Sequence, residues 1–219
     1  MDEAKRLING GWQRVLSLSQ TSGRGRRGSS WRTQEGGLAC TWVLSGGTLE
    51  RHSPGLIQTS VGAAVSDALG CCVKWPNDLV TEDGRKLGGV LVEGNSEDDG
   101  IRVGIGLNKR DSVIDGTTVA GWAEFVGEKT AIEVFDILDS AISSLFEEHS
   151  LVPPVEEEEL VALSWKSLAR SLSTGVALKS KGLPTRAVGL SSEGHLLIEF
   201  DGLVATIDDI NTLDWNPIT

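Results

Sequence analysis

The chain has 219 residues, of which 39% are hydrophobic and 23% charged, as in a medium globular domain or a core domain with a small appendage. Its formal net charge of −11 argues against a protein that coats nucleic acid or an anionic membrane. The charge is uneven, because residues 1–40 hold seven Lys and Arg against three Asp and Glu, a net charge of +4, which leaves −15 for the remainder. We therefore expect a local cationic site in an acidic protein.

The three cysteines are Cys40 and the adjacent pair Cys71 and Cys72. This arrangement is neither a disulfide framework nor the C-x-x-C spacing of a metal site, so we expect buried thiols in a reducing compartment. The N-terminal residues lack the apolar stretch of a signal peptide, and no run approaches the roughly 18 apolar residues of a membrane span. We therefore expect a soluble, cytoplasmic protein.

Apolar periodicity and turn residues divide the first half of the chain into short elements. In chain order they predict a helix over 2–9, strands over 15–19 and 38–44, a helix over 54–69, and strands over 72–75, 86–92 and 101–107. The helix over 54–69 has the strongest pattern, with Pro54 near its first turn and Gly70 just past its end. The three strands after it read as hairpins of a mixed sheet.

The second half predicts two further helices, one over 131–146 and one that begins in the acidic run 156–159, where carboxylates favour the positive end of the helix dipole. After Arg170 the pattern changes to short alternating segments, at 176–179, 185–190, 195–200 and 203–207. Four or five strands in so short a stretch indicate a small β-barrel appended to an α+β domain.

The segment Gly23-Arg-Gly-Arg-Arg-Gly28 matches the dinucleotide-binding pattern G-x-G-x-x-G. That pattern requires a helix directly after it to receive the pyrophosphate, and residues 29–37 are too polar and glycine-rich for such a helix. Glycines that let the backbone approach a ligand, together with three guanidinium groups, fit an anion site. A mobile basic surface loop is the alternative interpretation.

Three further segments carry polar groups at strand ends: Lys74-Trp-Pro-Asn-Asp78, Lys86-Leu-Gly-Gly-Val-Leu-Val-Glu93 and Gly104-Ile-Gly-Leu-Asn108. Together with the arginine loop they resemble the biotin protein ligases, enzymes that attach biotin to a lysine of biotin-dependent carboxylase carriers. The resemblance extends in order over nearly the whole chain, through Gln20-Thr-Ser, Trp31, Gly121-Trp122, Trp165-Lys-Ser-Leu and the C-terminal barrel.

The resemblance implies an α+β fold in which helices flank a mixed β-sheet, of the class II synthetase-like, lipoate–biotin ligase kind. It places a catalytic domain at residues 1–172 and a small SH3-like β-barrel at 173–219. It also implies two reaction steps: biotin and MgATP give biotinyl-5′-AMP and pyrophosphate, and the lysine of a biotin carboxyl carrier protein then takes the biotinyl group through a carbon–nitrogen bond. Such chemistry depends on orientation and charge neutralisation rather than on a protein nucleophile.

By the same resemblance the catalytic residues are Lys86, which would bridge the biotin carboxylate and the α-phosphate, Arg26 at the phosphates, and Asp78. Asp78 would hold Mg²⁺ or align the incoming amine, and a plain turn cap is its alternative role. The implied biotin-binding residues are Gln20, Gly23, Arg24, Gly25, Arg26, Lys86 and Gly89. The implied ATP-binding residues are Arg24, Arg26, Trp31, Asn77, Asp78, Asn108 and Trp122, with the Trp rings packed against adenine or covering it.

The sequence departs from the family pattern at its N-terminus, where the resemblance would place an Asp-Ser-Thr stretch directly before the first helix. Either biotin recognition is weakened or rebuilt, or Met1 is an internal residue of a longer chain. The winged helix-turn-helix of the relatives that are repressors is also not present in these 219 residues, so we expect a monofunctional ligase that binds no nucleic acid. A homodimer that pairs through sheet edges is compatible with the family.

Two other functions stay open at this level. A lipoate-type protein ligase would share the fold and the acyl-adenylate chemistry, and a degenerate, non-catalytic module would bind biotin or the carrier without reaction. The order of the arginine loop, the Lys-Trp-Pro-Asn-Asp segment and the barrel favours biotin. We expect only structural or surface roles for the three histidines, His52, His149 and His195.

Overall fold

A computed structural model describes residues 4, 13–45, 48, 51–94, 100–146, 155–173 and 176–217. The helix predicted over residues 2–9 lies outside these residues, apart from Ala4. None of the helices within the described ranges is long and apolar enough to cross a bilayer.

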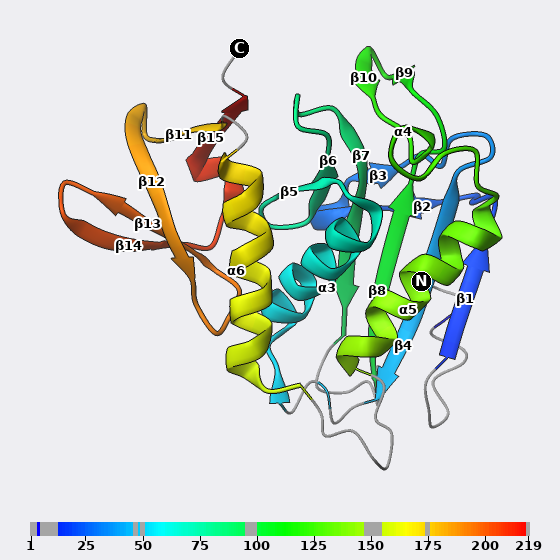
Figure 1. The fold of residues 1–219 in the computed structure, drawn as a ribbon, viewed down its shortest axis with the longest axis horizontal. Coiled ribbons are helices and arrows are strands. Elements are labelled where there is room, and N and C mark those ends of the chain that lie inside the picture. Colours follow the sequence, from blue (N-terminus) through cyan, green and yellow to red (C-terminus); the bar gives the residue numbers. More distant parts are fainter. Residues whose placement is uncertain are drawn as a thin grey trace.

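An eight-stranded sheet forms the centre of the first part of the chain (Figure 1). Its main path runs β1-β4-β8-β7-β10-β9, and β5 and β6 join it through β7. The strands are β1 (Gln13–Ser17), β4 (Leu38–Ser45), β5 (Cys72–Lys74), β6 (Asp78–Val80), β7 (Lys86–Glu93), β8 (Gly100–Leu107), β9 (Ser112–Ile114) and β10 (Thr117–Val119). The sheet is mixed, because β10 pairs parallel with β7 while the other pairings are antiparallel.

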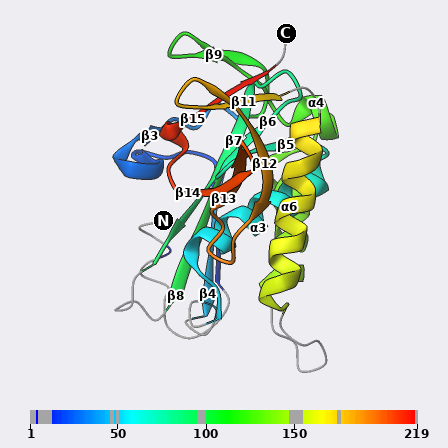
Figure 2. The same ribbon diagram turned by 90° about the vertical axis from the view of Figure 1, so that its left-hand side faces the viewer.

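Helices cover one face of this sheet. The long ones are α3 (Pro54–Leu69), α5 (Ala131–Phe146) and α6 (Glu157–Ser173), and α4 (Ala123–Val126) is a single turn. Ser53 caps α3 by accepting a hydrogen bond from the Leu56 amide at 3.1 Å, and Gly70 ends the helix in the left-handed conformation. The sheet lies between the helices and the small hairpin of β2 (Gly23–Arg24) and β3 (Ser30–Trp31) (Figure 2).

The structure confirms the predicted α+β class and mixed sheet, along with the helices over 54–69 and 131–146 and the helix that begins in the acidic run. Five elements of the structure have no counterpart among the predicted ones: β6, β9, β10, α4 and β15 (Leu213–Pro217). These elements are three to five residues long, too short for periodicity to distinguish them from turns.

The C-terminal strands form a second, five-stranded antiparallel sheet in the order β14-β13-β12-β11-β15. The strands are β11 (Val176–Ser180), β12 (Leu183–Leu190), β13 (Leu196–Phe200), β14 (Leu203–Ile207) and β15, and they bear out the predicted small SH3-like unit. A second apolar cluster lies between this sheet and α6, and it includes Leu168 of the helix and Leu196 and Ile198 of β13. The division at residues 172 and 173 stays a prediction.

One side chain ties the two sheets together. Trp75, which follows β5, is 2% exposed and belongs to the second apolar cluster. Its indole N–H donates a hydrogen bond to the Gly194 carbonyl at 2.9 Å. Gly194 has φ +77° and lies so close to Gly55 of α3 that a Cβ atom would be 2.5 Å from the Gly55 backbone. The turn before β13 is therefore wedged between α3 and the Trp75 ring.

We predict that Trp75→Phe lowers the free energy of unfolding by about 1–3 kcal/mol, because a buried carbonyl loses its donor and the smaller ring leaves a gap. The measurement is equilibrium unfolding in urea. Trp165→Phe is the matched control, since Trp165 is only partly buried against the same cluster, and it should cost less. Equal losses for both variants would contradict this role of Trp75.

Candidate functional site

Small side chains in register across three strands form the floor of a pocket. Gly106 of β8 pairs with Gly89 of β7 on one side and with Ala39 of β4 on the other. Directly opposite residues of an antiparallel pair project from the same face, so these three positions leave one side of the sheet open. The alternate positions Val90, Ile105 and Cys40 face the other way and are buried in the core beneath the helices.

A cavity of about 300 Å³ lies over this floor. It is lined by residues of the β2–β3 segment, the ends of β6 and β7, and the strands of the floor. The structure brings nine of the twelve predicted site residues to its wall: Gln20, Arg24, Gly25, Arg26, Trp31, Asn77, Asp78, Lys86 and Gly89.

Lys86 stands at the first position of β7, opposite Val80 of β6, and its side chain reaches Asp78 at the start of β6. Its Nζ donates a hydrogen bond to Asp78 Oδ1 at 2.6 Å and lies 5.8 Å from the centre of the Trp31 ring. The Trp31 ring in turn rests on Gly106, where a Cβ atom would be 2.5 Å from it. The ammonium group is therefore held by a carboxylate on one side and by an aromatic face on the other, which fixes its position at the cavity wall.

The arginine loop does not lead into a helix. Residues Gly23 to Trp31 form the hairpin of β2 and β3 with a single 3-10 turn, η1 (Arg26–Gly28), between them. The Gly25 amide donates to the Ser29 carbonyl at 2.7 Å, and the Ser29 amide donates to the Arg26 carbonyl at 3.0 Å. This geometry agrees with the rejection of a dinucleotide-binding turn.

Arg26 is the arginine of the loop that contacts Asn77, next to Asp78 at the cavity wall. Its Nη1 donates to Asn77 Oδ1 at 3.1 Å. Burial and, secondarily, the neighbouring charge of Arg27 lower the pKa of Arg26 from its usual value, while Asp78 and Asp209 act in the opposite direction. Because the partner of Arg26 is a neutral amide, its charge is available to an incoming anion.

Three predicted site residues do not line the cavity. Gly23 is enclosed by its pairing with Trp31 in the hairpin. Asn108 is 2% exposed; its Nδ2 donates to the Lys86 carbonyl at 3.4 Å, and its buried Oδ1 has no partner among the described residues. Trp122 is fully buried in the core and donates to the Lys129 carbonyl. The predicted contact of Trp122 with the nucleotide has no support in the structure, because the ring has no exposed face.

The cavity also contains residues that the sequence analysis did not select. Ala39 and Thr41 of β4, and Gly104 and Gly106 of β8, line it from the floor. Their small size at every second position was a detectable signal, but the pairing of the strands was needed to interpret it. The C-terminal residues Ile210 and Asn211 also line it, and no local pattern marks them as part of this site.

The charged groups of the wall indicate which ligands fit. Arginine and lysine residues face the cavity from the loop and from β7, and Asp78 is the one carboxylate among the described lining residues. Neither His52 nor His195 lines it. The described residues contain no group of three or more His, Cys, Asp or Glu side chains that could hold a metal ion. The cationic groups of the wall suit an anionic ligand.

Comparison with known proteins finds the family described as Biotin/lipoate A/B protein ligase, which matches residues 12–109. The chain is 31% identical over 203 residues to the bifunctional ligase/repressor BirA of Escherichia coli strain K12, covering 84% of this chain and 61% of that protein. It is 36% identical over 104 residues to a biotin–[acetyl-CoA-carboxylase] ligase of Paracoccus denitrificans, covering 43% of each. The chain therefore spans less than two thirds of the length of these relatives.

Among solved structures, the chain resembles the biotin protein ligase of Aquifex aeolicus in complex with biotin and ATP. The TM-score is 0.69 at 25% identity, and the match covers 98% of this chain and 94% of that one. Both the central sheet and the C-terminal sheet fall within this match.

We predict that Gly106→Ala lowers the free energy of unfolding by about 1–3 kcal/mol, because the new methyl group would displace the Trp31 ring from a tightly packed position. Gly62→Ala is the matched control. Gly62 lies within α3, and a Cβ atom there would meet nothing closer than the Val73 side chain at 4.0 Å. In a helix interior Ala is favoured over Gly by about 0.5–1 kcal/mol. Urea unfolding should give shifts of opposite sign; a Gly106→Ala protein as stable as the wild type would show that the ring does not rest on this strand.

Proposed function

We propose that the chain is a member of the biotin/lipoate A/B protein ligase family that activates biotin with ATP and transfers the biotinyl group to a lysine of a biotin carboxyl carrier protein. The observation that carries this proposal is the position of Lys86, held between Asp78 and Trp31 at the wall of a cavity that also contains Arg26. Two cations that converge on one cavity can bind a carboxylate and a phosphate side by side.

In the first step a biotin carboxylate oxygen attacks the α-phosphorus of ATP, and the bond from that phosphorus to the β-phosphate oxygen breaks, releasing pyrophosphate. Two anions must approach each other, so the main task of the protein is to neutralise charge and to align the groups. Lys86 lies at the junction of floor and wall, where its ammonium group would contact both anions. Arg26 would take the phosphate oxygens from the side of the loop.

In the second step the carrier lysine attacks the carbonyl carbon of biotinyl-5′-AMP, AMP leaves, and the amine loses a proton. Asp78 is the carboxylate that contacts Lys86, and it can align the incoming amine beside that ammonium group. Gln20 and Gly89 would contact biotin on the floor, while Asn77 and Trp31 would lie on the nucleotide side. A nucleotide contact by Asn108, which is buried and does not line the cavity, stays a prediction.

Magnesium would enter as MgATP. Mg²⁺ is commonly held by one or two carboxylates together with substrate phosphates rather than by a full protein cage. The single carboxylate Asp78 at the cavity fits that mode. When bound, the ion would offset phosphate charge, and Asp78 would supply the protein ligand.

We propose that the protein works in the cytoplasm, with biotin, ATP and a carrier protein as its partners and without binding nucleic acid or membranes. Cys40, Cys71 and Cys72 are all free thiols, as a reducing compartment allows. The C-terminal unit at residues 173–219 would act together with the catalytic domain at residues 1–172, since Ile210 and Asn211 reach the cavity.

We predict biotin-dependent exchange of pyrophosphate into ATP, which Lys86→Ala should reduce by about 10²–10³-fold through the loss of charge stabilisation in the transition state. Lys166→Ala is the control: Lys166 lies on the exposed face of α6, away from the lining of the cavity, so this variant should retain activity. Lipoate should support little exchange in comparison with biotin.

Each contrary result points to a different function. Exchange driven by lipoate in preference to biotin would identify a lipoate-type ligase. Binding of biotin without any exchange by the wild-type protein would identify a non-catalytic module. Full activity of Lys86→Ala would remove Lys86 from the reaction.

A further inference from the structure

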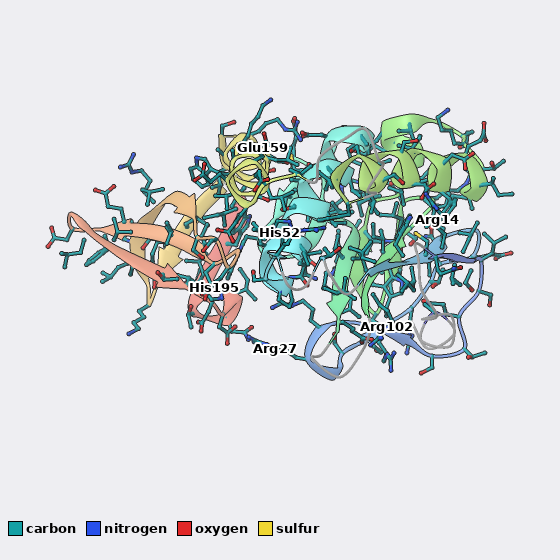
Figure 3. All side chains as sticks on the ribbon, turned by 90° about the horizontal axis from the view of Figure 1, so that it is seen from below. Arg14, Arg27, His52, Arg102, Glu159 and His195 are labelled. Atoms are coloured by element: carbon teal, nitrogen blue, oxygen red, sulfur yellow. The ribbon has the colours of Figure 1, made fainter. Side chains whose placement is uncertain are left out.

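The segment between β14 and β15 reaches the candidate site from the far end of the chain. It carries Asp208 and Asp209 and turns through a 3-10 helix, η2 (Ile210–Thr212), whose first two residues line the cavity. Arg27 of the arginine loop, 182 positions away in sequence, donates from Nη1 to Asp209 Oδ1 at 2.8 Å. In Figure 3 the labelled Arg27 lies on the side of its loop that faces the C-terminal strands.

The Asp209 carboxylate is fixed by its own turn. The same Oδ1 accepts a hydrogen bond from the Asn211 amide at 2.9 Å, and the Asp209 carbonyl accepts one from Thr212 Oγ1 at 2.7 Å. Hydrogen bonding from Arg27 is the main cause that lowers the pKa of Asp209, so the group is ionised at neutral pH. A carboxylate that is already oriented loses little further freedom when a guanidinium group binds to it.

Arg27 has a backbone conformation that requires support. Its φ of 53° and ψ of 34° lie in the left-handed region, which is unfavourable for a residue with a side chain. The three arginines of the loop contact three separate parts of the molecule: Arg24 contacts Glu93 at the end of β7, Arg26 contacts Asn77, and Arg27 contacts Asp209. Arg27 supplies the contact to the C-terminal sheet.

We propose that Asp209 is a positioning residue of the site: by pairing with Arg27 it fastens the Gly23–Gly28 loop to the C-terminal sheet and holds Arg26 at the cavity. The pairing also neutralises Arg27, so the charge that the loop offers to a ligand is concentrated at Arg26. The catalytic consequence rests on the proposed function, whereas the fastening is argued from the contact between Arg27 and Asp209 alone.

Hydrogen exchange of the ligand-free protein tests the fastening without any reaction. The amides of Gly25 and Ser29 are hydrogen-bonded within the loop and report its opening. Asp209→Asn keeps an oxygen acceptor for the Asn211 amide and removes the charge, and Arg27→Gln removes the other partner. Each should speed exchange of these amides about threefold to tenfold, as expected for a partly exposed charged pair. Asp208→Asn, an exposed neighbour, is the control and should exchange like the wild type.

The double variant Arg27→Gln/Asp209→Asn should exchange no faster than either single variant, because the two residues act through one contact. Additive effects would mean that the residues act independently, and unchanged exchange in Asp209→Asn would mean that the pair does not hold the loop. Either result would overturn the proposal.

The effect of the Arg27–Asp209 pair on activity is tested with the pyrophosphate exchange assay. Asp209→Asn should raise the KM for ATP by about threefold to tenfold while kcat changes less than about twofold, since the pair positions a binding group and contacts no reacting atom. Faster amide exchange with an unchanged KM would refute the positioning role. A wild-type protein that shows no biotin-dependent exchange would refute the proposed function, and the hydrogen-exchange result would still decide whether Asp209 fastens the loop.

Discussion

The absence of side-chain volume at three paired positions makes the rest of the site possible. Gly89, Gly106 and Ala39 lie side by side on β7, β8 and β4, so the face of the sheet opposite the helices is hollow where larger residues would fill it. The Trp31 ring can rest on Gly106 only for this reason. Its position brings the β2–β3 hairpin against the sheet and gives Lys86 an aromatic neighbour. The floor, the loop and the lysine thus depend on one packing constraint.

The electrostatic organisation of the site follows from the same arrangement. An acidic protein with a net charge of −11 concentrates cationic groups at one cavity, with Lys86 restrained by Asp78 and Arg26 by the neutral amide of Asn77. Asp78 and the Trp31 ring orient Lys86, whereas Arg26 has a neutral partner and keeps its full charge for a ligand. Such a site is pre-organised for two anions that must react with each other, as biotin and ATP do in the proposed first step.

Much of the fold could be predicted from the sequence because its long elements have a clear period. The helices α3 and α5 and the strands β7 and β8 were expected close to where they lie. Nine of the twelve site residues implied by the family resemblance also line one cavity, to which both the central sheet and the β2–β3 hairpin contribute. What depends on distant pairing could not be predicted: the small residue at Ala39 has meaning only beside Gly106, and Asn211 reaches the site only through the folding of the C-terminal sheet. The buried position of Trp122 likewise follows from packing.

The central claim is that one cavity holds biotin and ATP close enough to join them. Native mass spectrometry of the protein mixed with biotin, ATP and Mg²⁺ tests this most directly, because an acyl adenylate that stays bound adds its own mass to the protein. We expect one biotinyl-5′-AMP per chain, formed only when both substrates are present and not formed by Lys86→Ala. A protein that carries biotin and ATP together, yet never their joined product, would contradict it.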